Sequence, residues 1–179
     1  MRGVGLIIVM AGVVIGAGVA IVFGAFPTRT DIREIDFSRS GCFGRCPAYE
    51  VTFRSDGCAV LVGDRNTLLV GRYTGIVPFQ KLASLVESRH FWDLHNQYAM
   101  NVWDTPGMKL RVVKPSMTKV VETRASDSSE VPVDFYEIGK LIDGFVFTTY
   151  WFSNGHVHNP SEPGRFDVMP PSKYVPNCV

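Results

Sequence analysis

The segment YEVTFRSDGCAVLV, residues 49–62, decides the fold. Apolar and polar residues alternate from Tyr49 to Phe53, which is the period-two pattern of a strand with one buried face. Asp56-Gly57 follows, a dipeptide typical of a tight hairpin turn. Residues 58–62 are mainly apolar again and suit a partner strand. The segment therefore predicts an antiparallel hairpin.

Further strands are expected on both sides of this hairpin. Residues 32–37 suit a first strand, and residues 67–73, after a turn at 63–66, complete an antiparallel meander. Residues 108–114 and 118–124 predict a second hairpin.

Two helices are expected to cover this sheet. Pro78 suits the first turn of a helix, and apolar residues recur at helical spacing after it, as far as Arg89-His90. Residues 133–152 carry apolar side chains along one side and predict a second helix that ends in Tyr150-Trp151-Phe152. The predicted fold class is α+β: an N-terminal transmembrane helix, then an antiparallel sheet (meander plus hairpin) with two helices packed on one face.

The N-terminal run from residue 3 to residue 26 contains no charge and no side chain more polar than glycine. About 20 such residues suffice to cross a bilayer, and the run is longer than the roughly 7–15 apolar residues of a signal peptide. A retained transmembrane anchor over residues 1–27 is therefore expected, with a cleaved signal peptide as the alternative.

Small residues recur every four positions in this run, at Gly12, Gly16, Ala20 and Gly24. Such a stripe lies on one face of a helix and lets a neighbouring membrane helix approach closely. The alternative interpretation is chance, because glycine and alanine are common in membrane helices.

The rest of the chain divides into two parts. Residues 28–152 are expected to form one extracytoplasmic α+β domain, and residues 153–179 an irregular tail containing Pro, Gly and His. The tail shows no periodicity, which is typical of a disordered segment or of one laid against a partner. Arg2 is one of the 18 Lys and Arg residues, so the remainder carries 17 of them against 17 Asp and Glu. Because a neutral domain lacks the electrostatic footprint of a nucleic-acid binder, no nucleic-acid partner is expected.

All four cysteines, Cys42, Cys46, Cys58 and Cys178, lie beyond the anchor. An even set after a signal-like start is typical of an oxidising, extracytoplasmic compartment. The structural interpretation joins Cys42 to Cys46 and Cys58 to Cys178, although sequence does not choose among the three possible pairings.

Two other interpretations of the cysteines concern chemistry. Cys42 and Cys46 are a candidate thiol-redox pair if Arg45 lowers a thiol pKa, although the motif lacks Cys-x-x-Cys spacing. The Cys-x-x-x-Cys-Pro motif also looks like the metal-binding turn of periplasmic copper chaperones that serve cytochrome oxidase. Two thiolates would suit Cu(I), because soft sulfur ligands select this ion. Those proteins carry a proline where Phe43 stands here. His156 and His158 are the additional candidate ligands.

The sequence contains no motif of a common enzyme class. GxSxG, a phosphate-binding glycine loop, HExxH and Cys-x-x-Cys-His are all missing, so neither catalytic residues nor a cofactor are expected. His90 and His95 are expected at a helix end and on the surface, and Asp56 and Asp104 in turns.

Residues 42–49, Cys-Phe-Gly-Arg-Cys-Pro-Ala-Tyr, followed by Asp56-Gly57, resemble the signature of an uncharacterised bacterial family known as a domain of unknown function. The likeness continues through residues 71–73 and 104–106 and covers roughly residues 31–151. The resemblance implies the fold pattern and an exported bacterial setting, and it implies no activity.

Together these features predict a single-pass protein of the bacterial inner membrane with its domain on the periplasmic side. The expected function is that of an interaction module, a non-catalytic accessory subunit that stabilises a membrane protein complex of the respiratory or photosynthetic kind. Its partners would be the lipid bilayer and other membrane subunits, contacted through the transmembrane helix and the domain. The alternative is a periplasmic thiol-redox or copper-binding protein that uses the Cys-x-x-x-Cys-Pro motif.

Overall fold

The computed structural model describes residues 29–100, 103–124, 131–153, 156–161, 166–168 and 178. The expected anchor and its stripe of Gly12, Gly16, Ala20 and Gly24 lie outside these residues. Across the described ranges, no helix is long and apolar enough to cross a membrane.

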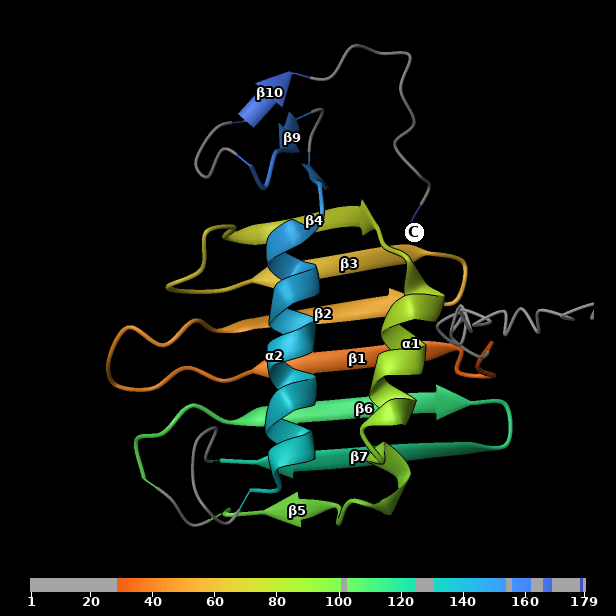
Figure 1. Ribbon diagram of the computed structural model, residues 1–179. Coiled ribbons are helices and arrows are strands. Elements are labelled where there is room, and N and C mark those ends of the chain that lie inside the picture. Colours follow the sequence, from red (N-terminus) through yellow and green to blue (C-terminus); the bar gives the residue numbers. More distant parts are fainter. Residues whose placement is uncertain are drawn as a thin grey trace, which may run out of the picture.

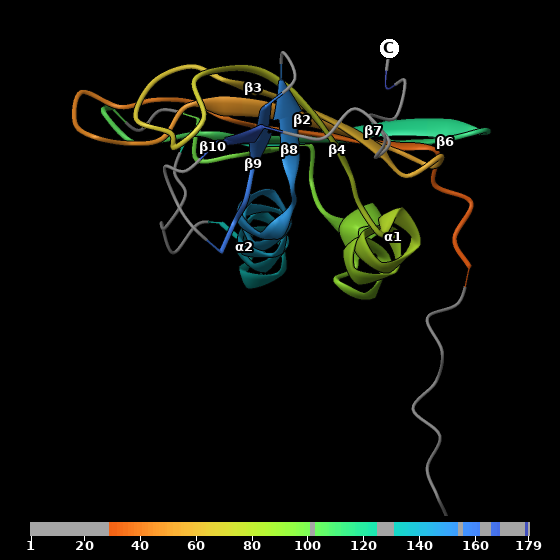
Figure 2. The ribbon, with the colours of Figure 1, turned by 90° about the horizontal axis from the view of Figure 1, so that it is seen from above.

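Within the described residues, one ten-stranded sheet forms, and two helices cross one of its faces (Figures 1 and 2). The strands are β1 (Glu34–Arg39), β2 (Tyr49–Arg54), β3 (Cys58–Gly63), β4 (Gly71–Ile76), β5 (Gln97–Tyr98), β6 (Met108–Lys114), β7 (Met117–Thr123), β8 (Trp151–Ser153), β9 (His156–His158) and β10 (Phe166–Val168). The helices are α1 (Phe79–Ser88) and α2 (Val133–Thr148), with a 3-10 turn at Phe91–Asp93.

The strand order is β10-β9-β8-β4-β3-β2-β1-β6-β7-β5. Strands β1 to β4 form the meander, and the β6–β7 hairpin pairs with β1. All pairs are antiparallel except β5 with β7, which is parallel. The predicted α+β class, with two helices on one face, is confirmed, whereas the prediction of a wholly antiparallel sheet is wrong.

The core lies between this sheet and the two helices. The alternation in β2 holds, since Val51 and Phe53 point inward and are 1% and 0% exposed. Residues from both helices cover them, among them Leu82 of α1 and Ile138 of α2, both fully buried. Burial of such side chains stabilises the fold by about 1.5–3 kcal/mol each relative to leaving them exposed.

Helix α2 ends at Thr148, so the prediction that it continues to Phe152 is wrong. Thr149 has an extended backbone, and Trp151 begins β8, which pairs with β4 at Gly75. The Trp151 side chain is fully buried, and its Nε1–H donates to the Val146 carbonyl at 2.8 Å. Aromatic and β-branched residues favour strands. Because the Trp151 side chain is buried and hydrogen-bonded in this position, the segment after Thr148 forms a strand and does not continue the helix.

Strand β4 begins later than the expected segment 67–73. Residues 64–70 form a loop whose end packs against the end of β3. The contact is so close that a Cβ at Gly63 would lie 1.7 Å from the Leu69 carbonyl oxygen, so only glycine fits at position 63. Gly71 then begins the strand with φ of +113°, a conformation that favours glycine.

The C-terminal tail also contributes to the sheet. Residues 156–158 form β9, which pairs with β8, and residues 166–168 form β10, which pairs with β9. Cys178 is buried and bonded to Cys58. The segment predicted to be irregular therefore contains two short strands and one covalent attachment among its described residues.

The two ends of the sheet differ in what they carry. The described chain enters at the end where β1 begins, and β1 runs away from that point (Figure 1). The connections 40–48 and 64–70, and the described parts of a third at 99–100 and 103–107, lie together at the opposite end (Figure 1). We call this opposite end the loop end.

Candidate functional site

A groove of about 890 Å³ opens between the connections at the loop end. It is lined by Ser40, Gly41, Cys42, Phe43, Gly44, Arg65, Met100, Trp103, Asp104, Thr105 and Arg124. We call this hollow the loop-end groove. Three separate connections and the end of β7 contribute to it, so residues far apart in the sequence form one surface.

The disulfide loop, residues 42–46, forms one wall of the groove. Cys42 and Cys46 are bonded, with their Cα atoms 5.5 Å apart. Cys58 is bonded to Cys178, so both pairs are those that the structural interpretation joins. The Cys42–Cys46 bond closes the loop into a small ring and restricts the backbone conformations of Phe43 and Arg45.

Two side chains hold the disulfide loop from outside. The carboxylate Oδ1 of Asp104 accepts the backbone N–H of Phe43 at 2.6 Å. The amide of Asn66 donates to the Cys46 carbonyl at 3.3 Å and lies 3.5 Å from that of Gly44. Both Asp104 and Asn66 have φ of +57°, a left-handed conformation that these residue types tolerate best among non-glycine residues. Backbone held in this region clusters at functional sites.

Two aromatic side chains project from these connections into solvent. Phe43 is 95% exposed and Trp103 is 93% exposed, the highest values among the large apolar residues that the structure describes. Most other aromatic residues pack in or against the core. Exposed aromatic groups on a surface are typical of a contact with a partner, because their burial drives association.

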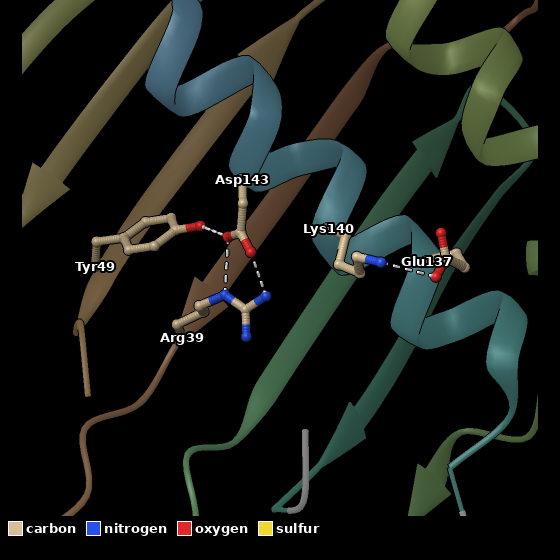
Figure 3. A network of polar contacts seen from close by, with 5 residues as sticks. All are labelled: Arg39, Tyr49, Glu137, Lys140 and Asp143. Atoms are coloured by element: carbon tan, nitrogen blue, oxygen red, sulfur yellow. Dashed lines mark hydrogen bonds and ion pairs between the residues drawn. The ribbon is translucent and has the colours of Figure 1, made fainter. Parts of the chain in front are cut away.

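A polar network lies beneath the loop end (Figure 3). The Arg39 guanidinium donates from Nε to Asp143 Oδ1 at 2.8 Å and from Nη2 to Oδ2 at 2.5 Å. The Tyr49 hydroxyl also donates to Asp143 Oδ1. Arg39, Tyr49 and Asp143 line a cavity of about 280 Å³ together with Cys46 and Pro47. The network thus joins α2 to β1 and β2 directly behind the disulfide loop.

The network changes the acidity of its members. Burial raises the pKa of Tyr49, and the neighbouring Asp143 carboxylate raises it further through its charge and hydrogen bond. Burial alone would lower the pKa of Arg39, but the hydrogen bond and charge of Asp143 outweigh it, so that pKa is raised. Arg39 therefore stays charged and Tyr49 stays a hydrogen-bond donor at neutral pH.

Raising the pH above the ordinary tyrosine pKa is expected to destabilise the fold through Tyr49. The pKa of Tyr49 is raised in the folded state. Its contribution to the free energy of unfolding is therefore complete below about pH 10, and it declines as the pH rises towards the folded-state pKa. The decline reaches at most about 1.4 kcal/mol per pH unit. Urea midpoints of the wild type and of Tyr49→Phe at about pH 8 and about pH 11 measure it. Equal pH slopes in the two proteins would contradict the assignment.

The histidines proposed as metal ligands lie on β9. His156 is exposed, whereas His158 is 5% exposed and lines an apolar cavity of about 450 Å³ with Pro47, Tyr49 and Leu61. Burial lowers the pKa of His158. In the described part of the chain, no three His, Cys, Asp or Glu residues form a group that could hold a metal ion. Copper binding and thiol exchange at the disulfide loop stay predictions.

The remaining sequence candidates have structural positions. Asp56 accepts the backbone N–H of Cys58 at 2.9 Å, which confirms its role in the hairpin turn. His90 lies at the end of α1, and the ring of His95 stacks on Tyr98. Asp104 lies in a bend as expected, and its contact with Phe43 was not predicted.

Comparison with known proteins gives one family. The family model described as "Domain of unknown function (DUF6438)" matches residues 33–146. No curated protein matches the chain. The match confirms the resemblance to an uncharacterised family, and it spans the meander, both hairpins and nearly all of α2. The bacterial origin stays a prediction.

Proposed function

Since the chain belongs to the DUF6438 family, whose description assigns no activity, we propose its function from the loop-end groove. The protein is a membrane-anchored extracytoplasmic interaction module. It acts as a non-catalytic accessory subunit that stabilises a membrane protein complex of the respiratory or photosynthetic kind. The loop-end groove is the surface that binds the partner subunit.

The observation that carries this proposal is the display of Phe43 and Trp103. Both side chains are more than nine-tenths exposed, on connections that a disulfide and two hydrogen-bonding side chains hold in place. A folded domain gains nothing from exposing them alone, whereas a partner gains from burying them. Because the disulfide loop is already ordered, its binding costs less conformational entropy than that of a flexible loop.

The direction of the chain supports a partner surface outside the bilayer. The described chain enters the fold at the end of the sheet where β1 begins, and the loop end lies at the far end of β1 (Figure 1). Six residues of extended strand span about 20 Å. With an anchor at residues 1–27, the loop-end groove would lie at the end of the sheet opposite the point where the chain enters, free to face the extramembrane part of a neighbouring subunit.

A variant carrying both Phe43→Ala and Trp103→Ala is expected to leave the complex. Central aromatic contacts cost about 2 kcal/mol or more each when truncated, so the double variant should bind at least about a hundredfold more weakly. Native electrophoresis of membranes solubilised in mild detergent measures the fraction that migrates with the partner.

The matched control is Tyr150→Ala, which removes an aromatic side chain that is 49% exposed and lies away from the groove. It should leave migration unchanged. A double variant that still migrates in the complex would refute the loop-end groove as the binding surface.

A further inference from the structure

We infer that the loop-end groove recognises an extended acidic segment of the partner protein, in which carboxylates are interspersed with apolar side chains. This inference rests on the proposed function and adds the chemistry of the partner. It is based on the charged side chains that line the groove and on their positions beside the exposed aromatic side chains.

The charged lining of the groove is mainly cationic. Arg65 lines it from the 64–70 connection and Arg124 from the end of β7, and Arg45 is exposed on the adjoining disulfide loop. Asp104 is the acidic residue in the lining, and its Oδ1 already accepts the backbone N–H of Phe43. The residues that line the groove therefore carry more positive than negative charge, although the chain beyond Arg2 carries equal numbers of basic and acidic residues.

Several arginines elsewhere in the domain are paired with carboxylates. Ion pairs form at Arg39, Arg54, Arg89 and Arg111. Within the described residues, neither Arg65 nor Arg124 forms a comparable pair. Arg33 and Arg72, outside the groove lining, also form none among these residues, so what distinguishes Arg65 and Arg124 is their shared position in the groove.

The Arg65 guanidinium also lies close to the start of the disulfide loop. A Cβ at Gly41 would lie 2.9 Å from both Nε and Nη2 of Arg65, so the side chain fits there because residue 41 is glycine. Arg65 therefore lies beside the wall that carries Phe43.

The combination of side chains defines the ligand. A guanidinium forms paired hydrogen bonds with a carboxylate, and an exposed aromatic ring packs against an apolar side chain. Phe43 and Trp103 lie in the same groove as Arg65 and Arg124, so a segment that offers both kinds of group satisfies both. Arginine and tryptophan are also the residue types that contribute most to protein interfaces.

The test places a photoreactive benzoylphenylalanine at position 43 of the full chain in its native membranes. After irradiation, mass spectrometry identifies the cross-linked residues of the partner. We expect a protein segment with several Asp or Glu residues close to the cross-link. The variant with Arg65→Glu and Arg124→Glu should lower the cross-link yield at least about tenfold.

Two further variants make the result specific. Arg65→Gln with Arg124→Gln removes the charges without reversing them and should give an intermediate yield. Arg72→Glu, at an exposed site on β4 outside the groove lining, reverses one charge elsewhere on the surface and should leave the yield unaltered. Lysines in place of the mapped acidic residues should restore cross-linking to the reversed variant.

The outcomes separate the inference from the proposed function. A cross-link to a protein segment without acidic residues, or one insensitive to charge reversal, would overturn the inference and leave the interaction module standing. A cross-link to nucleic acid, which arginine and aromatic groups also bind, would overturn both. So would the absence of any cross-linked protein.

Discussion

Replacing both Cys58 and Cys178 by alanine is expected to lower the free energy of unfolding by about 5 kcal/mol. The two residues are 120 positions apart in the sequence, so their bond closes a loop that covers most of the domain. In the chain-entropy model, such a bond stabilises by restricting the unfolded chain, and its effect grows with loop length. Urea unfolding of the detergent-solubilised protein, followed by its tryptophan fluorescence, to which the buried Trp151 contributes, measures the loss.

The matched control is the double alanine variant of Cys42 and Cys46, which are four positions apart. The same model gives this short loop only about 2 kcal/mol. Equal losses in the two variants would contradict the assignment of the larger effect to loop length. The control also reports on binding, since opening the disulfide loop should weaken the complex more than it weakens the fold.

Replacing Asp143 by alanine is expected to lower the free energy of unfolding by about 3–5 kcal/mol, because the charged Arg39 then lies in a poorly solvated site without its carboxylate partner. The Arg39 side chain is 11% exposed, and that of Asp143 is 23% exposed. Tyr49 also loses the acceptor of its hydroxyl. Unfolding free energies of wild type and variant at neutral pH measure the effect.

Asp134 provides the control on the same helix. It pairs with Arg89 at 3.9 Å, with side chains 36% and 40% exposed, so Asp134→Ala should cost at most about 1 kcal/mol. Replacing Arg39 by methionine together with Asp143 by leucine should recover most of the loss, because apolar residues need no partner. If the apolar pair is as unstable as Asp143→Ala, the loss does not come from an uncompensated charge.

Local patterns in the sequence predicted the middle of the domain well. Alternation from Tyr49 to Phe53 and the Asp56-Gly57 turn placed β2 and β3 correctly, because both signals depend on adjacent residues. Helix α1 begins directly after Pro78, as expected. These elements owe their boundaries to local chemistry, which the sequence displays directly.

The errors occur where distant contacts decide. Apolar residues continue past Thr148, so periodicity alone extended α2, and the pairing of Trp151 with Gly75 ends it. Strand β5 has only two residues and pairs in parallel with β7, which leaves no pattern to detect. Boundaries of this kind depend on partners far away in the chain.

The candidate site was only partly predictable for the same reason. The cysteine spacing indicated the disulfide loop, but the bond between Tyr49 and Asp143 joins residues 94 positions apart. The exposure of Phe43 and Trp103 had no sequence signal, because aromatic residues are more often buried. Asn66 was not singled out, since its role depends on the return of the 64–70 connection.

If the protein is an accessory subunit, it binds a partner in its native membrane. Extraction in mild detergent, sizing of the particle and identification of co-migrating chains by mass spectrometry would reveal that partner. We expect a large stoichiometric complex from which the Phe43→Ala and Trp103→Ala double variant is released. A lone small particle would contradict it, and the thiols of Cys42 and Cys46 after mild reduction would then be the groups to count.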